Sequence, residues 1–366
     1  MRISELSHKI LPYVLKPLSW AYGAVVDVRN WMFDHGVLNQ EEFDVPVISV
    51  GNITVGGTGK TPHVEYLAGL LALDYNIAIL SRGYKRKTKG FILANKHSNP
   101  DTIGDEPMQL YNKLGNHVKV AVCEKRSAGI KHLLRLYPDL QLIILDDAFQ
   151  HRYVKPKVNI LLMDYTRPIY EDKILPLGRL RESAHSANRA DMVIITKCPQ
   201  NLAPLSYRLV SNRLALMPYQ KLYFSTLSYG EPTPVFPDDK PFHVSLHNLT
   251  SRDTVLVMTG IANPRGFVRH FKSYPFKVIV DHYPDHHDFT REDLKRMEEK
   301  VQSMPGERKL ILTTEKDAVR LAYNPYFPNS LKQFIFYIPV SVKMLPAIDG
   351  GNIIDNLNKA MNAQAL

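Results

Sequence analysis

Three glycines beside a lysine–threonine pair form the segment of this chain best suited to bind phosphate. They lie in the run V-G-N-I-T-V-G-G-T-G-K-T-P, residues 50–62. Glycine lets successive backbone N–H groups converge on phosphate oxygens, a lysine can reach the β- and γ-phosphates of a nucleotide, and a threonine hydroxyl can bind Mg²⁺. The predicted nucleotide-binding residues are Thr54, Val55, Gly56, Gly57, Thr58, Gly59, Lys60 and Thr61.

This segment departs at one position from the general pattern G-x-x-x-x-G-K-[ST], because Thr54 stands where the first glycine is expected. An apolar run at 45–50 precedes the segment, and a helical spacing of apolar residues begins at Val64. The order strand, loop, helix is the one that a phosphate site needs. A plain glycine-rich turn between a strand and a helix is the alternative interpretation.

Two aspartates end a second apolar run, L-Q-L-I-I-L-D-D, residues 140–147. In enzymes with a phosphate-binding loop, carboxylates at such a strand end hold Mg²⁺, and the carboxyl ends of parallel strands share one edge of the sheet. We therefore expect Asp146 and Asp147 to lie beside the loop, with Gln150 and His151 within reach of the same region. The alternative is that the two aspartates simply end a strand in a turn.

Two further segments could carry out proton chemistry. Asp105 and Glu106 open an expected helix at G-D-E-P, where adjacent carboxylates can also serve only as helix caps and dipole partners. His286 lies in D-H-Y-P-D-H-H-D, residues 281–288, which suggests either a metal site or a histidine that orients a general base across a cleft. No second His or Cys group with zinc-like spacing accompanies this cluster.

A run of basic residues, S-R-G-Y-K-R-K-T-K-G at 81–90, follows an expected strand. Arg82 directly ends that strand on the side of the sheet where ligands bind. The run is either a solvated loop or an anion-binding edge for a phosphate or lipid headgroup. Further along, T-K-C-P at 196–199 places Pro199 where guanine-specific proteins have an aspartate, which favours ATP over GTP.

Strands alternate with helices over roughly the first 215 residues, which predicts an α/β fold of the P-loop NTPase type with a doubly wound, mainly parallel sheet. Proline and turn residues cluster at 229–240, and a smaller α/β block follows. We expect two domains, residues 1–225 and 226–366, joined by this proline-rich linker. The expected strands are 45–50, 77–81, 118–122, 140–147, 158–164, 192–196, 254–260, 277–281, 309–313 and 334–340. The expected helices include 64–73, 104–114, 125–137 and 264–273, with one opening at Thr290 and one after Gly351.

The composition is that of a soluble enzyme, with 45% hydrophobic and 22% charged residues in a chain of 366. The net charge of +10 indicates an anionic partner, and nucleotide phosphates, a phosphorylated lipid, an anionic membrane surface and nucleic acid fit it equally well. The two cysteines, Cys123 and Cys198, lie in apolar runs, as expected of reduced core residues in a cytosolic protein.

Apolar residues recur at three- and four-residue steps from 10 to 33, where both tryptophans, Trp20 and Trp31, also lie. Interspersed charges and two prolines, Pro12 and Pro17, argue against a membrane-spanning helix and a signal peptide. An amphipathic helix is expected, either packed on the protein's own core or lying at a membrane interface.

Taken together, these motifs resemble the tetraacyldisaccharide 4′-kinase family, the lipid A kinases of Gram-negative bacteria. The resemblance covers most of the chain, and Thr54 in the loop is itself a family feature. The matching motifs are V-G-N-I-T-V-G-G-T-G-K-T-P (50–62), S-R-G-Y (81–84), G-D-E-P (104–107), L-D-D-A-F-Q-H (145–151), L-P-L-G-x-L-R-E (175–182), R-A-D (189–191), D-H-H-D-F (285–289) and T-T-E-K-D-A (313–318).

The resemblance implies ATP- and Mg²⁺-dependent phosphorylation of the 4′-hydroxyl of a tetraacyldisaccharide 1-phosphate. It implies that Lys60 contacts phosphate, that Thr61, Asp146 and Asp147 lie on the metal side, and that Glu106 lies near the metal. Ala148 and Phe149 follow the two aspartates, where the family commonly has glycine and then leucine or phenylalanine; this difference should matter little for the metal.

For the acceptor side, the resemblance implies that Asp105 takes the proton from the hydroxyl, with His286 as its partner. Arg181 and Glu182 match a further active-site pair, and Arg82 is a candidate substrate contact. The lipid acceptor would stay in the inner membrane while the enzyme docks peripherally from the cytoplasmic face. Neither a nucleic-acid partner nor a protein partner is expected.

Two other classes of function compete with this interpretation. A P-loop metallochaperone or nucleotide switch would use the histidine cluster to hold metal, although the guanine-reading aspartate and the Cys/His spacing are missing from the sequence. A nucleic-acid-dependent ATPase would use the positive charge, although no recognised nucleic-acid module is present in the sequence.

Overall fold

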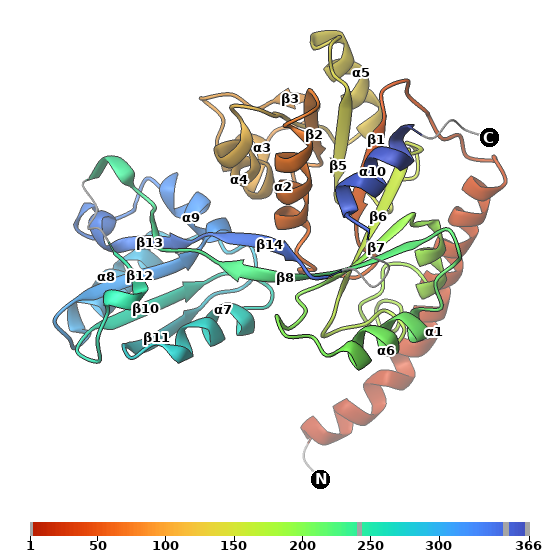
Figure 1. Ribbon diagram of the computed structural model, residues 1–366. Coiled ribbons are helices and arrows are strands. Elements are labelled where there is room, and N and C mark those ends of the chain that lie inside the picture. The colour runs from red at the N-terminus through yellow and green to blue at the C-terminus, as the bar shows by residue number, and fades with distance from the viewer. Residues whose placement is uncertain (1–2, 240–243, 347–350, 363–366) are drawn as a thin grey trace.

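A computed structural model describes residues 3–239, 244–346 and 351–362 and shows two lobes (Figure 1). The larger lobe is built on a nine-stranded sheet of order β14-β8-β7-β6-β1-β5-β2-β4-β3, and the smaller on a five-stranded sheet of order β11-β10-β12-β13-β9. The predicted α/β fold with a large, mainly parallel sheet and a second, smaller α/β unit is confirmed.

The seven inner strands of the larger sheet, from β8 to β4, pair in parallel, and the two edge strands, β14 and β3, pair antiparallel to their neighbours. The central strands are buried and mostly apolar, as expected of a parallel sheet with helices on both faces. The strands of this sheet are β1 Val47–Gly51, β2 Ile77–Ser81, β3 Ile92–Leu93, β4 Lys119–Val122, β5 Leu142–Asp146, β6 Val158–Asp164, β7 Met192–Thr196, β8 Lys221–Tyr229 and β14 Val340–Met344.

One hydrophobic core of the larger lobe joins strand residues such as Ile48 to Leu67 of α2 and Leu357 of α10, the last described helix. A second core on the other side includes Ile130 and Leu133 of α5. The helices of this lobe are α2 Lys60–Leu71, α3 Pro100–Ile103, α4 Asp105–Leu114, α5 Arg126–Leu136, α6 Pro204–Leu214 and α10 Ile353–Asn362.

The smaller lobe has its own core, in which Leu256 and Ile311 of the sheet pack against Leu294 and Leu321 of two helices. The helix expected at Thr290 is present and begins with a capping box between Thr290 and Asp293. The elements are β9 Thr233–Pro234, β10 Thr254–Thr259, α7 Arg265–His270, β11 Lys277–His282, α8 Arg291–Ser303, β12 Lys309–Thr314, α9 Glu315–Ala322 and β13 Ile335–Ile338.

Two strands of the larger sheet carry the chain between the lobes. β8 runs outward to Tyr229 and β14 runs back beside it, with Gly230 N donating to Pro339 O at 2.8 Å (Figure 1). The strand expected at 334–340 is therefore two strands, β13 and β14, in different sheets. Pro339 separates them because a proline cannot donate to a strand ladder.

Residues 226–366, expected to form the second domain, are divided between the two lobes. β14 lies in the larger sheet and α10 packs on the larger core, so only the part between β8 and β14 builds the smaller lobe. The expected linker at 229–240 begins inside β8, and its last residue, Lys240, lies outside the described residues.

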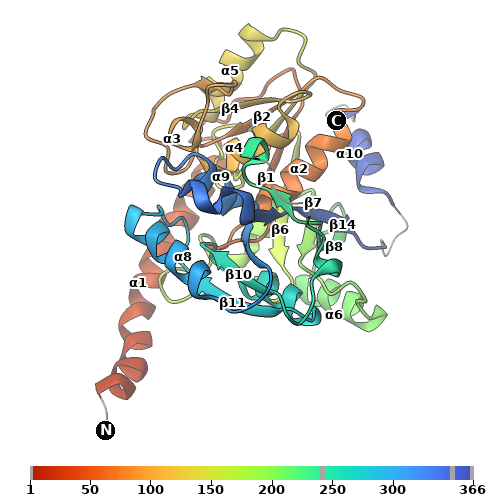
Figure 2. The same cartoon turned by 90° about the vertical axis from the view of Figure 1, so that its left-hand side faces the viewer.

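The N-terminal helix, α1 (Ile3–Asp34), is longer than the expected segment at 10–33. It packs along the larger lobe at its C-terminal end and projects away from the body at its N-terminal end (Figure 2). Among the described residues, no helix combines the length and the apolar character needed to cross a membrane.

Candidate active site

The loop between β1 and α2 has the backbone conformation of a phosphate-binding loop. Gly56 and Gly59 have φ values of 114° and 84°, which residues with side chains rarely adopt. Gly59 is also the N-cap of α2, so the free N–H groups of the first helical turn lie next to the loop. Thr54 has no positive φ and instead forms an antiparallel bridge with Leu180, which explains why this position does not need glycine.

Buried polar side chains hold the loop from inside the lobe. Asn52 Nδ2 donates to Thr58 Oγ1 at 2.8 Å and to Thr54 Oγ1 at 3.3 Å. Thr196 Oγ1, at the end of β7, donates to Thr58 O at 2.8 Å. The loop is thus tied to a strand that is not its neighbour in the sequence.

Lys197 ties the loop to the sheet a second time. Its Nζ donates to Gly57 O and lies 2.7 Å from Asp164 Oδ2, at the end of β6. Its backbone is left-handed, with φ of 57°, which fits a residue held in place by the surrounding structure. Sequence reasoning placed Lys197 at a strand end and gave it no role. Its position two residues before Pro199, where guanine-specific proteins have an aspartate, was the signal that could have drawn attention to it.

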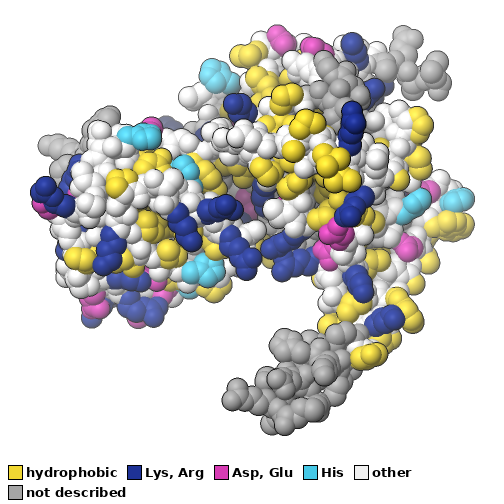
Figure 3. Space-filling model, turned by 60° about the horizontal axis from the view of Figure 1, so that its bottom comes forward, with side chains coloured by type: hydrophobic (Ala, Val, Ile, Leu, Met, Phe, Trp, Pro, Cys, Tyr) yellow, Lys and Arg dark blue, Asp and Glu magenta, His cyan; other side chains and the backbone are white. Residues whose placement is uncertain are grey.

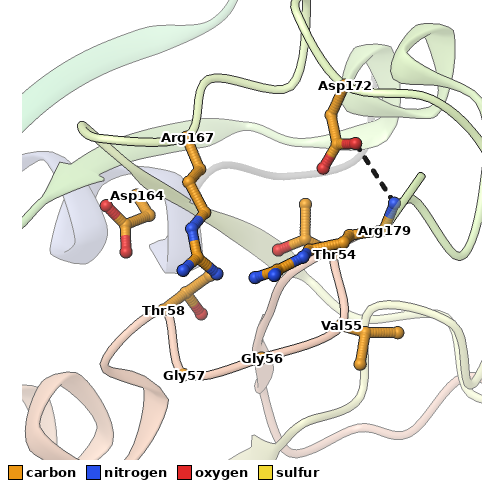
Figure 4. A pocket seen from close by; sticks show the side chains of 9 residues that line it. All are labelled: Thr54, Val55, Gly56, Gly57, Thr58, Asp164, Arg167, Asp172 and Arg179. Carbon is orange, nitrogen blue, oxygen red and sulfur yellow. Dashed lines mark hydrogen bonds between the residues drawn. The ribbon is translucent and has the colours of Figure 1, made fainter. Parts of the chain in front are cut away.

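A small pocket opens beside the loop, and Figure 4 shows the guanidinium groups of Arg167 and Arg179 directed toward it. Arg179 N donates to Asp172 Oδ1 at 3.1 Å, which fixes the backbone of this arginine. Two cations beside a phosphate-binding loop suit an anionic ligand. Sequence reasoning missed both arginines, although Arg179 occupies the variable position of the L-P-L-G-x-L-R-E motif.

The predicted metal-side aspartates lie beside the loop. Ser81 Oγ, at the end of β2, donates to Asp146 Oδ2 at 3.1 Å. Asp147 Oδ1 lies 3.6 Å from Lys60 Nζ and 3.5 Å from Arg181 Nη1. The structure therefore brings together the loop lysine, the second aspartate and the arginine that the sequence singled out.

Asp146 has surroundings that favour a cation. Burial, together with the negative charges of Glu106 and Asp147, raises the pKa of Asp146 to about 7 against the opposing charge of Lys60. Its Oδ1 is buried and has no hydrogen-bond partner among the described residues. A buried carboxylate next to two other carboxylates fits the oxygen-rich chemistry of Mg²⁺.

The described residues contain no group of three or more His, Cys, Asp or Glu side chains that could hold a metal ion as they stand. The histidine cluster at 281–288 is divided among different partners. His287 Nε2 lies 2.8 Å from Asp293 Oδ2, whereas His282 Nδ1 lies 3.3 Å from Thr259 Oγ1.

His286 lies 3.3 Å, through Nδ1, from Oδ2 of Asp105, so the smaller lobe meets the larger lobe at this pair. Asp105 is the first residue of α4. Gly104 before it has φ of 92°, and a Cβ there would lie 3.0 Å from Tyr84 O, so both the conformation and the space favour glycine. Burial raises the pKa of Asp105, but hydrogen bonds from His286 and Arg320 outweigh this effect and leave the pKa below its usual value.

Two cations of α9 complete the contact between the lobes, and sequence reasoning missed both. Arg320 Nε lies 2.7 Å from Asp105 Oδ2, and Lys316 Nζ lies 2.9 Å from Glu106 Oε1 and 2.8 Å from His286 Nε2. The T-T-E-K-D-A motif at 313–318 was a signal for Lys316, but Arg320 lies just beyond it.

The three residues expected to contact substrate have different surroundings. Arg82 is exposed. Burial, followed by the positive charges of Arg126, Arg29 and Arg82, lowers the pKa of the nearby His151 to about 4. Glu182 is only 1% exposed.

The neighbours of Glu182 explain why it is buried. Glu182 Oε2 accepts from Asn30 Nδ2 of α1 at 3.1 Å and from Arg189 Nη2 at 2.8 Å. Arg181, by contrast, is half-buried and open toward Asp147. Glu182 therefore anchors α1 rather than facing the open side of the loop.

The description "LpxK: Tetraacyldisaccharide-1-P 4'-kinase" belongs to a family model that matches residues 11–360. The chain belongs to the tetraacyldisaccharide 4′-kinase family. A family member from Bacteroides thetaiotaomicron is 48% identical over 338 residues, covering 90% of this chain and 88% of that protein. Another, from Porphyromonas gingivalis, is 46% identical over 338 residues, covering 90% of this chain and 92% of the relative.

A solved structure agrees with this membership. The crystal structure of LpxK from Aquifex aeolicus in complex with ATP matches with a TM-score of 0.71 at 28% identity. The match covers 96% of this chain and 98% of that one. The tetraacyldisaccharide 4′-kinase family therefore shares both lobes with this chain.

Proposed function

We propose that the chain transfers the γ-phosphoryl group of ATP to the 4′-hydroxyl of a tetraacyldisaccharide 1-phosphate, a lipid A precursor. The family membership supports the reaction, and one observation in the structure supports its location. Asp105 and Glu106 stand side by side at the start of α4, where Asp105 meets His286 of the smaller lobe and the charge of Glu106 acts on Asp146 beside the loop.

The donor half of the site is the loop with its neighbours. Residues 54–61 surround the phosphates with backbone N–H groups, and Lys60 neutralises the transferring group. Thr61, Glu106, Asp146 and Asp147 would hold Mg²⁺, which would spread the charge of the phosphate oxygens. The buried, unpartnered Oδ1 of Asp146 is the feature that supports this assignment.

The acceptor half is the pair between the lobes. Asp105 accepts the proton of the 4′-hydroxyl as the hydroxyl oxygen bonds to the γ-phosphorus and the bond to the β-phosphate oxygen breaks, releasing ADP. The low pKa of Asp105 keeps its carboxylate ionised before the reaction, and His286 orients it. Because the pair forms only where the lobes meet, closure around both substrates would exclude water and suppress hydrolysis of ATP.

The lipid would reach this site along α1. The described part of α1 exposes Leu18, Trp20, Val25, Val28 and Trp31, each more than half exposed. Figure 3 shows hydrophobic side chains along this helix and Lys and Arg side chains gathered where the lobes face each other.

This arrangement suits peripheral docking on the cytoplasmic face of an anionic inner membrane. Arg82 and Arg181 would contact the acceptor. Glu182 would act through α1, because it is buried against Asn30.

The test is the fate of ³²P from labelled ATP, followed by thin-layer chromatography with a lipid A precursor. The wild-type chain is expected to label the lipid, whereas a nucleotide switch or metallochaperone would release only free phosphate. Asp105→Ala should lose transfer while it keeps ATP binding, and loss of ATP binding would instead assign Asp105 to the metal or to the fold. His286→Ala should lower turnover with little change in the KM for ATP, and wild-type turnover would remove His286 from the site.

A further inference from the structure

We propose that Arg320 and Lys316 of α9 are positioning residues that hold the Asp105–His286 pair in its working geometry across the two lobes. The inference rests on the proposed function, because it assigns a role to residues around the proposed base. The inference also gives a role to residues of the T-T-E-K-D-A motif, which the proposed function left unassigned.

Arg320 is built to face Asp105. Its side chain is 6% exposed and contacts Asp105 Oδ2 through Nε at 2.7 Å and through Nη2 at 2.6 Å. Both contacts and the contact from His286 fall on the same oxygen, Oδ2. A carboxylate held through one oxygen has the other free to accept the proton of a hydroxyl group.

Arg320 is itself held by the smaller lobe. Its Nη1 donates to Asp317 Oδ1 at 3.1 Å. The other oxygen of Asp317 accepts from Gly260 N at 2.8 Å and from Thr314 Oγ1 at 2.7 Å. A Cβ at Gly260 would lie 2.9 Å from Asp317 Oδ1, so this position requires a residue without a side chain.

The result is a continuous chain of hydrogen bonds from the end of β10 to the proposed base on the other lobe. Asp317 has a fully buried side chain, so the guanidinium group has little freedom to turn away from Asp105. The planar fork of arginine can bond Asp317 and Asp105 together, whereas a lysine would offer a single ammonium group.

Lys316 determines which ring nitrogen of His286 carries the proton. An ammonium group can only donate a hydrogen bond, so the Nε2 atom 2.8 Å from Lys316 Nζ must accept. The ring proton is then on Nδ1, which faces Asp105 Oδ2. Nη2 of Arg320, 3.2 Å from Nδ1, is closer to the carboxylate and donates there.

The large lobe holds the other sides of His286. Tyr84 packs edge-on against the ring, with 5.2 Å between ring centroids, and Lys85 Nζ donates to His286 O at 3.3 Å. Asp285 Oδ1 lies 3.7 Å from Lys316 Nζ. Groups from both lobes therefore hold the Asp105–His286 pair, and the geometry of the pair depends on the contact between the lobes.

The experiment compares Arg320→Ala, Arg320→Lys and the control Arg252→Ala. Arg252 is an exposed arginine of the same lobe that pairs with exposed Glu307, so the control removes the same charge away from Asp105. We expect Arg320→Ala to lower kcat for the lipid by about 10- to 100-fold, because misplacing a reacting group by about 1 Å has effects of this size. The dissociation constant for ATP should stay unchanged, and Arg320→Lys should restore part of kcat.

If Arg320→Ala has the kcat of Arg252→Ala, the proposal is overturned. If Arg320→Ala does not fold, as judged by circular dichroism, the folded Arg320→Lys variant decides, and wild-type kcat in it counts against the proposal.

A second measurement does not depend on activity. In ¹⁵N-histidine NMR spectra, with the His286 signals assigned by loss in His286→Ala, Nδ1 should carry the proton and Nε2 should not. Lys316→Met should change that pattern. A wild-type chain that leaves the lipid unlabelled would contradict the proposed function alone, and an unchanged His286 pattern in Lys316→Met would contradict the positioning role.

Discussion

Asp146 and Asp147 are adjacent in the sequence but have opposite surroundings. Asp146 ends β5 and is 3% exposed, whereas Asp147 has φ of 48° and a side chain that is 36% exposed. The left-handed turn directs one carboxylate toward Ser81 inside the lobe and the other toward Lys60 and Arg181 at the loop. The two aspartates are therefore not equivalent in the proposed metal site.

Asp147→Asn should increase the Mg²⁺ concentration needed for half-maximal turnover by about 10- to 100-fold, the range seen when groups supporting a metal are removed. The substitution keeps the shape but removes the charge that Lys60 and Arg181 face. Turnover measured over a series of Mg²⁺ concentrations tests this expectation. Asp139→Asn, at an exposed turn, is the control, and an identical Mg²⁺ curve for both variants would show that Asp147 does not support the metal.

Lys197→Met should weaken ATP binding by about tenfold or more, because a charge-assisted hydrogen bond contributes roughly 1.5–3 kcal/mol. The variant leaves Gly57 O and Asp164 without their shared donor, so the loop loses its tie to β6. Isothermal titration calorimetry with ATP measures the effect. Lys221→Met, at the exposed start of β8, should bind as the wild type does, and equal affinities in the two variants would refute the role of Lys197.

Two buried histidines should each remove stability from the fold as the pH falls from about 6.5 toward 4, whereas buried Asp146, with its pKa raised to about 7, has the opposite effect over the same range. Burial lowers the pKa of His63 and of His151 from 6.5 to about 4, so in this window the unfolded chain binds protons that the folded chain does not. The stabilisation is complete above 6.5 and decreases as the pH falls, by at most about 3 kcal/mol per histidine. Thermal unfolding followed by circular dichroism across this range measures it.

His151→Leu should lose less stability than the wild type between pH 6.5 and 4, because it removes one of the two buried rings that must bind a proton on unfolding. His97→Leu, which changes an exposed histidine, should keep the wild-type slope. A slope that is the same in all three chains would mean that His151 is not held neutral by the fold.

Val25→Asp should weaken binding to anionic phospholipid vesicles without affecting the fold. Val25 is 70% exposed on α1, and a carboxylate there opposes both insertion and the negative lipid surface. Co-sedimentation with vesicles measures the effect. Leu73→Asp changes a residue that is 80% exposed after α2 and should bind vesicles normally; equal loss in both variants would argue against docking through α1.

The larger sheet and its loop could be predicted because their signals are local. Apolar runs of strand length end in glycine or aspartate at one edge, and the parallel order follows from the alternation with helices. The split of 334–340 into two strands was not predicted, because an apolar run containing one proline reads as continuous. Only the partners of the two halves, β12 for one and β8 for the other, show that they belong to different sheets.

The site was predictable where a residue type carries its own chemistry and not where it depends on contact between lobes. Lys60 and Asp147 follow from the loop and the strand end. Arg320 looks like an ordinary helix residue until the fold places it against Asp105, which is 215 positions away in the sequence. Glu182 shows the opposite case, since a charged residue in an active-site motif is buried beneath α1.

The return of the chain to the larger lobe has a consequence for the order in which the protein can mature during synthesis. The strands around the phosphate loop leave the ribosome early, but Ile353, Leu357 and Met361 of α10, which cover their core, are made after the whole smaller lobe. A nascent chain therefore exposes this apolar surface until almost all of the described residues have emerged.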